Sequence, residues 1–199
     1  MITLYGDFVE ETLGEQAYLA IGFSPSSVPL KQRWRNNGLS ADFLADYFST
    51  FFPAADQESD EINQRDELRG TVSYIANELL ENAMKFNYER SSYPINIRLY
   101  LYPDHLVFLV TNSISPKQAE SLQKRIQQLL HEDSESLYLQ TLEQNAEQDI
   151  LECSGLGLLS MINDYGAKLS WKLELLPLEI PLMLLTTRVE LAVDGFGAY

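Results

Sequence analysis

The chain lacks the residues that several protein classes need. Of its 199 residues only one is cysteine, Cys153, and only two are histidine, His105 and His131. A single cysteine excludes an internal disulfide framework and is typical of a reducing compartment. Residues 1–7 lack the charged and apolar regions of a signal peptide. We therefore expect a cytoplasmic protein.

Positive charge and long hydrophobic runs are also scarce. The chain has 14 Lys and Arg against 29 Asp and Glu, a formal net charge of -15. Such a charge repels phosphate backbones, so we expect no nucleic-acid partner. The apolar stretch 175–185 is interrupted by Pro177 and Pro181 and is shorter than the ~20 residues of a membrane helix. We expect no membrane span.

Hydrophobic residues make up 45% of the sequence, which is enough for one domain over 1–199 with a sizeable core. Alternating apolar patterns predict strands at 17–23, 95–102, 106–111, 169–175 and 183–193. Helical spacing predicts helices at 41–52, with Ser40 as N-cap, from about 61 through 87, and at 115–131, 134–147 and 156–165. The mixture is an α/β, more narrowly α+β, composition. An N-terminal strand and helix extension covers about 1–55, and a helical, lid-like insertion covers about 115–153.

The segment ELLENAMKFN, residues 78–87, carries the most informative polar groups. At about 100° per residue, Glu78, Asn82 and Lys85 lie on one side of the predicted helix. A carboxylate, an amide and an amine on one helix edge could serve as general base, metal ligand and phosphate counter-charge. The alternative is an ordinary polar helix edge, in which Lys85 pairs with Glu81 four residues earlier.

A second informative segment is SGLGLLSMI, residues 154–162. Gly155 and Gly157 permit a tight turn and close backbone approach, and the amides near Leu156 and Leu158 could hold an anion. Ser154 could contribute a hydroxyl or cap the following helix. The alternative is a turn that only joins the insertion to the sheet.

The order of the predicted elements resembles the ATP-binding domain of the GHKL superfamily, which includes gyrase, MutL and histidine kinases. In this order, the helix carrying ExxxN is followed by the strand hairpin, the helical insertion and the GxG turn. More narrowly, the segments VTNSISP at 110–116, LQKR at 122–125 and GLGLLSMI at 155–162 resemble the SiaB-type protein kinases, which are akin to anti-sigma-factor serine kinases. The resemblance implies a Bergerat-type fold, with a mixed, mostly antiparallel sheet covered on one face by helices.

The resemblance also implies roles for particular residues. Glu78 matches the carboxylate that orients or deprotonates the attacking group, and Asn82 matches the amide that binds Mg²⁺ on the phosphates of ATP. Gly155 and Gly157 match the phosphate-side loop. The wider superfamily carries DxGxG where this chain has TNSIS at 111–115. Asn112 can accept a hydrogen bond from adenine in place of the aspartate, at a cost of about 1 to 2 kcal/mol.

Two functions follow from the resemblance. The first is a regulatory kinase that uses ATP and Mg²⁺ to phosphorylate a serine or threonine of a STAS-like antagonist, or that sequesters this antagonist, in a partner-switching pathway. The alternative is a catalytically inactive module of the same fold that binds a STAS-like partner or forms a homodimer. The aromatic stripe at 43–52 suits a core or an oligomer face and slightly favours the module. A histidine kinase fragment is a weaker alternative, because both histidines follow Glu78.

Overall fold

In the computed structural model, the described residues are 1–11, 16–24, 30–51, 59–147, 155–177 and 182–193, with the backbone alone at 30–36, 59–64 and 147. Five helices and six strands lie in this part of the chain. In chain order they are β1 Ile2–Tyr5, β2 Ala17–Phe23, α1 Leu30–Ser49, α2 Ser59–Lys85, β3 Ile95–Leu101, β4 His105–Ile114, α3 Pro116–His131, α4 Ser134–Glu147, α5 Gly157–Asn163, β5 Lys168–Leu176 and β6 Leu182–Ala192.

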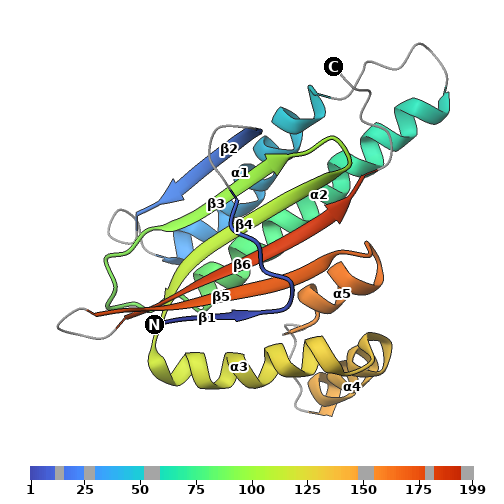
Figure 1. Cartoon of the computed structure of the whole chain (residues 1–199). Helices are drawn as coiled ribbons and strands as arrows, with labels where there is room; N and C mark the ends of the chain where they lie inside the picture. The colour runs from blue at the N-terminus through green and yellow to red at the C-terminus, as the bar shows by residue number, and fades with distance from the viewer. Residues whose placement is uncertain (12–15, 25–29, 52–58, 148–154, 178–181, 194–199) are drawn as a thin grey trace.

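The six strands form one sheet in the order β1-β5-β6-β4-β3-β2 (Figure 1). Every pairing among them is antiparallel, so the described sheet is antiparallel throughout rather than mixed. The β3–β4 hairpin pairs Ile97 with Val110 and Leu99 with Phe108. The protein therefore belongs to the α+β class.

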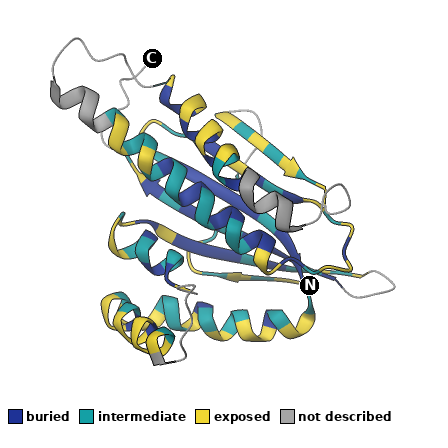
Figure 2. Ribbon diagram, turned by 180° about the vertical axis from the view of Figure 1, so that it is seen from behind, coloured by how far each residue is buried: buried dark blue, intermediate teal, exposed yellow. Residues whose placement is uncertain are grey.

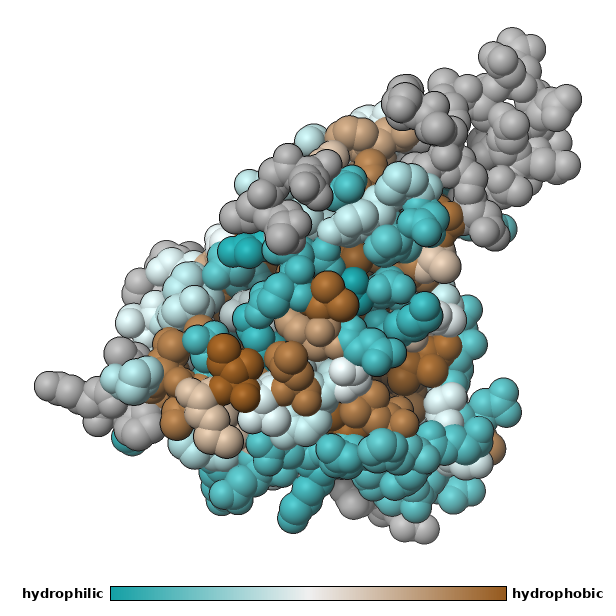
Figure 3. All heavy atoms as spheres, viewed as in Figure 1, coloured by the Kyte–Doolittle hydropathy of each residue, from teal (hydrophilic) through white to brown (hydrophobic). Residues whose placement is uncertain are grey.

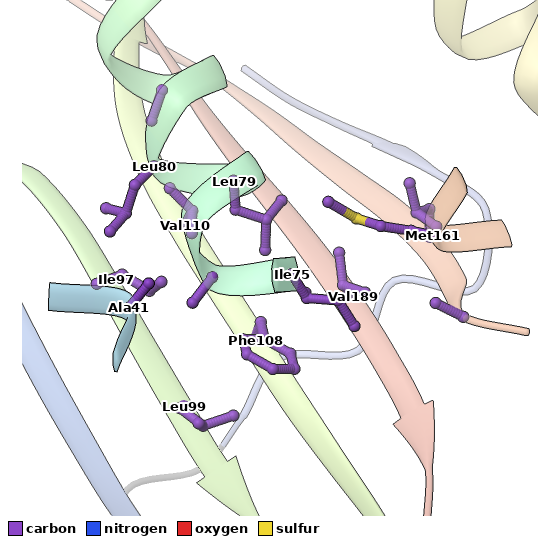
Figure 4. Close-up of a cluster of buried hydrophobic side chains, with 14 of the residues drawn as sticks. Ala41, Ile75, Leu79, Leu80, Ile97, Leu99, Phe108, Val110, Met161 and Val189 are labelled. Atoms are coloured by element: carbon purple, nitrogen blue, oxygen red, sulfur yellow. The ribbon is translucent and has the colours of Figure 1, made fainter. Parts of the chain in front are cut away.

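The helices α1, α2 and α5 lie on one face of the sheet, and the main core is between them and the strands (Figure 2). Alternation along β4 turns Phe108 and Val110 towards the helices. Figure 4 shows these side chains beside Ile75 and Leu79 of α2 and Met161 of α5. The residue spacing of α2 thus buries one stripe of this long helix and leaves its polar edge available.

Apart from α1, the predicted strands and helices occur within a few residues of their expected positions. The helix α1 begins earlier than predicted. It starts at Leu30 and runs through Ser40, which is therefore not an N-cap. Asn37, Ala41 and Leu44 are all fully buried on one face, so packing extends the helix past Gly38 and Ser40. The sequence patterns also missed β1, a four-residue edge strand that pairs with β5.

The helices α3 and α4 begin and end within one residue of their predicted bounds, whereas the predicted end of the insertion, 148–153, lies outside the described residues. The start of α3 is tightly fixed. Ser115 and Gln118 form a capping box, in which each side chain satisfies a backbone amide of the other residue. Gln118 Nε2 also donates to the Phe86 carbonyl at 3.1 Å, which ties α3 to the end of α2. None of the helices in the described part of the chain is long and apolar enough to cross a membrane.

Candidate functional site

A cavity of about 300 Å³ lies between the last turns of α2, the sheet, α3 and the glycine turn before α5. This volume is at the lower end of the range for small-molecule sites. Most of the wall is apolar: Leu79, Ala83, Phe86, Val110, Ile114, Leu122, Leu158, Trp171 and Leu185. The polar groups in the wall are Asn82, Asn112, Gln118, Ser121, Arg125 and Thr187. An apolar wall with a few polar groups suits a ligand that has a flat hydrophobic part and a polar end.

The two segments singled out in the sequence meet at this cavity. Asn82 comes from α2, Asn112 from β4, and Gly155, Gly157 and Leu158 from the glycine turn. A Cβ atom added to Gly157 would overlap the carboxylate of Glu78. Glu78 therefore packs directly on the turn, and a side chain at position 157 would force its carboxylate to move.

The environment of Glu78 raises its pKa above the ordinary carboxyl value, first because the group is partly buried and then because Glu81 lies nearby. The Asn77 side-chain amide donates a hydrogen bond to Glu81 Oε1 at 2.9 Å. A hydrogen bond between Tyr74 and Ser160 and the contact of the Tyr74 and Tyr165 rings, with centroids 5.2 Å apart, hold α2 against α5. A carboxyl group with a raised pKa, held rigidly at a cavity, is suited to proton transfer.

Gly155 shapes the turn in a different way. Its φ of 86° is in the left-handed region, where a side chain would strain the backbone. Its carbonyl oxygen accepts a hydrogen bond from Arg125 Nη2 at 3.3 Å. The two glycines thus have separate reasons to be glycine: backbone conformation at Gly155 and close contact with Glu78 at Gly157.

Asn112 lies almost completely buried in the floor of the cavity, 2% exposed. Its amide nitrogen donates to the Ser113 carbonyl at 3.3 Å. This bond uses the donor side of the amide and leaves the oxygen as an acceptor for a ligand N–H group.

Four predicted residues do not line the cavity. Glu78 is one of them, and it reaches the site only through its close contact with Gly157. Lys85 is exposed, with its ammonium nitrogen 5.8 Å from the centroid of the Phe86 ring, and it does not line the cavity. Leu156 is buried in a separate cluster with Leu137 and Leu159. Ser154 lies outside the described residues.

The cation at the cavity is Arg125, which the sequence reasoning did not select. Its guanidinium donates to Gly155 O and Thr141 Oγ1, each at 3.3 Å, and to Gln128 Oε1 at 3.5 Å. Burial lowers the pKa of Arg125, although an arginine stays charged at neutral pH. Among the described residues no carboxylate pairs with it. The available signal was its place one turn after Leu122 and Ser121 on the cavity side of α3.

Comparison with known proteins adds no further assignment, because no protein-family model matches the chain and no curated protein matches it significantly. Within the described residues, no group of three or more histidine, cysteine, aspartate or glutamate side chains could hold a metal ion. The site is therefore defined by its own geometry: Glu78 and Asn82 on α2, Asn112 on β4, the glycine turn and Arg125.

Proposed function

We propose that this protein has a histidine-kinase-like ATPase fold of the GHKL type and binds Mg-ATP in the cavity. We further propose that it transfers the terminal phosphoryl group to a serine or threonine of a STAS-like protein antagonist in a partner-switching pathway. The observation that carries the proposal is the contact of Glu78 with Gly157 beside Asn82 and Asn112. Residues chosen from three separate segments thus line one cavity, and Glu78 packs on the glycine turn beside them.

The apolar wall suits the base of the nucleotide. A flat ring could lie on the apolar side chains of Leu79, Val110 and Trp171. Burial of the apolar area of the ring would supply affinity. The Asn112 oxygen would accept the amino group of adenine. A neutral acceptor makes this bond weaker than a carboxylate would, by about 1 to 2 kcal/mol. The loss lowers affinity about tenfold to thirtyfold.

The glycine turn and Arg125 suit the phosphates. The hydrogen-bond partners of Arg125 among the described residues are all neutral. The charge of Glu132 acts on Arg125 from beyond ion-pair distance, so the guanidinium is still available to an anion. A guanidinium binds phosphate oxygens in a bidentate manner. This residue takes the role of counter-charge that the sequence had suggested for Lys85.

Asn82 is the residue that would hold Mg²⁺. Mg²⁺ at a nucleotide usually has few protein ligands and completes its shell with phosphate oxygens and water, so the amide oxygen of Asn82 would be one ligand among these. When bound, the ion supplies charge neutralisation on the phosphates. Glu78, one helical turn before Asn82, would accept the proton of the attacking hydroxyl.

The test is transfer of labelled phosphate from Mg-ATP to a purified STAS-like protein from the same organism. Glu78→Gln should abolish transfer while the affinity for Mg-ATP stays within a few-fold of wild type. Glu67→Gln is the matched control, because Glu67 is exposed on the same helix and does not line the cavity. Normal transfer by Glu78→Gln would remove the catalytic assignment.

A non-catalytic interaction module is the second candidate, because one face of α1 presents an apolar stripe. Leu39, Phe43 and Tyr47 are spaced four residues apart and are 70%, 55% and 38% exposed. Such a stripe is typical of a surface that contacts another protein. If millimolar Mg-ATP gives no binding signal, this candidate becomes the better one.

A further inference from the structure

The face of the sheet opposite the main helices is crossed by residues 6–11 of the chain itself (Figure 1). We call residues 7–11 the strap. It follows β1 and passes in front of the sheet before the chain reaches β2 (Figure 1). Polar residues cover much of the centre of this face in Figure 3. The strap therefore covers a surface that takes no part in the main core or in the cavity.

The strap attaches to the sheet through side chains. Phe8 packs on a small apolar cluster formed by Tyr100, Val107 and Leu109. Among the described residues, the backbone of the strap forms no hydrogen bond to the strands. A strand that belongs to a sheet is held by its backbone, whereas a bound peptide that contacts pockets is recognised by its side chains. In this respect the strap resembles a bound ligand.

The acidic end of the strap meets the cations of this face. Glu11 pairs with Arg188 at 3.0 Å, and the two side chains are 5% and 7% exposed. The hydroxyl of Tyr102 also donates to Glu11. Glu10 pairs with Lys172 at 2.5 Å, and the Lys172 ammonium lies 5.8 Å from the Phe8 ring centroid. Arg188 also pairs with Glu190 of its own strand at 2.9 Å. In a chain of net charge -15, Lys172 and Arg188 thus form a small cationic site whose partners are carboxylates.

We propose that this face is a binding surface for an extended segment of a partner protein, with an aromatic side chain followed two and three residues later by carboxylates. The strap occupies the surface in the free protein and competes with that partner. The apolar cluster takes the aromatic ring, and Lys172 and Arg188 take the carboxylates. Because the strap is tethered, its effective concentration is about millimolar. A partner segment binds only when its affinity and concentration are high enough to displace the tethered strap.

The experiment uses the full chain and a fluorescent peptide with the sequence of residues 6–11, Gly-Asp-Phe-Val-Glu-Glu. Phe8→Ala removes the aromatic anchor of the strap and leaves its ion pairs intact. Fluorescence anisotropy should show this variant binding the peptide at least tenfold more tightly than wild type. A second peptide with alanine in place of phenylalanine should lose the binding. Val9→Ala is the matched control, because Val9 is 59% exposed, and it should behave as wild type.

Equal binding of the peptide by wild type and Phe8→Ala would overturn the proposal, as would equal binding of the two peptides. Absence of saturable binding to the folded variant would show that the strap is a fixed part of the fold. If circular dichroism shows that Phe8→Ala does not fold, Glu10→Gln replaces it, because that pair is at the exposed rim. It should raise peptide affinity by a smaller factor, and no change would contradict the proposal.

Discussion

Two arginines in the described part of the chain, one buried and one partly buried, have opposite surroundings. Arg188, on the strap side of the sheet, pairs with Glu11 at 3.0 Å and with Glu190 at 2.9 Å. Arg125, at the cavity, donates only to a carbonyl, a hydroxyl and an amide oxygen. Arg188 is buried, and a buried charge is costly unless it is paired, so the fold provides its counter-charges. Arg125 is only partly buried, and no carboxylate among the described residues lies within ion-pair distance of it. The difference indicates where the fold holds its own segment and where it can accept an anion.

The strongest test of this comparison is Arg188→Gln. The change leaves Glu11 buried without its cation, so the free energy of unfolding should fall by about 3–5 kcal/mol. Urea denaturation measures the loss, and the midpoint should shift without a change in the affinity for Mg-ATP. Adding Glu11→Gln should restore part of the stability, because the uncompensated charge is then gone. A loss below about 1 kcal/mol would place the pair among ordinary surface ion pairs.

Gly157→Ala tests the cavity side. The added Cβ overlaps the Glu78 carboxylate and must displace it. A displacement of about 1 Å is enough to slow transfer about 100-fold. Phosphotransfer rates measure the effect.

Gly70→Ala is the control for this change, because it lies in α2 with no atom within 4 Å of the added Cβ. It should stabilise the protein by about 0.5–1 kcal/mol and leave transfer unchanged. If Gly157→Ala transfers phosphate at the wild-type rate, Glu78 does not act from the position seen in the structure.

The smallest expected effect is the contribution of Glu78 to the pH dependence of the free energy of unfolding. Its pKa is raised in the folded state by burial and by Glu81. The folded protein therefore binds this proton more tightly than the unfolded chain does. The stabilising contribution is complete below the ordinary carboxyl pKa and is lost as pH rises through the raised pKa.

Glu78→Gln cannot ionise at this position, so it should be slightly more stable than wild type at neutral pH and lose this advantage in acid. Thermal unfolding of both proteins across pH 4–8 measures the difference. Parallel stability curves would show that Glu78 is not perturbed.

Much of the fold was predictable because its elements follow local patterns. The alternation of β3 and β4 and the capping box at Ser115 and Gln118 are readable from neighbouring residues. The start of α1 at Leu30 was not readable, because Gly38 and Ser40 interrupt the local helical pattern. The strand β1 is short and exposed, and only its pairing with β5 identifies it.

The candidate site was also predictable in part. Asn82, Asn112 and the two glycines were chosen by motif and line the cavity. Glu78, chosen in the same way, packs on Gly157 beside it. Lys85 was chosen by its helical phase alone, and phase does not show how far a side chain reaches. Arg125 belongs to the LQKR segment, but its role depends on a contact with Gly155, thirty residues later. Such a contact exists only after α3 and the glycine turn have packed together.

The most direct test of the central claim is calorimetric titration of the wild-type protein and of Arg125→Gln with Mg-ATP. Wild type should bind saturably, and the variant should bind at least tenfold more weakly, because about 1.5–3 kcal/mol is typical of a hydrogen bond to a charged group. The free energy of unfolding of the variant should change by less than about 1 kcal/mol, since no carboxylate among the described residues loses its partner. Equal affinities would contradict the assignment of Arg125, and no heat from wild type at millimolar Mg-ATP would contradict the nucleotide site itself.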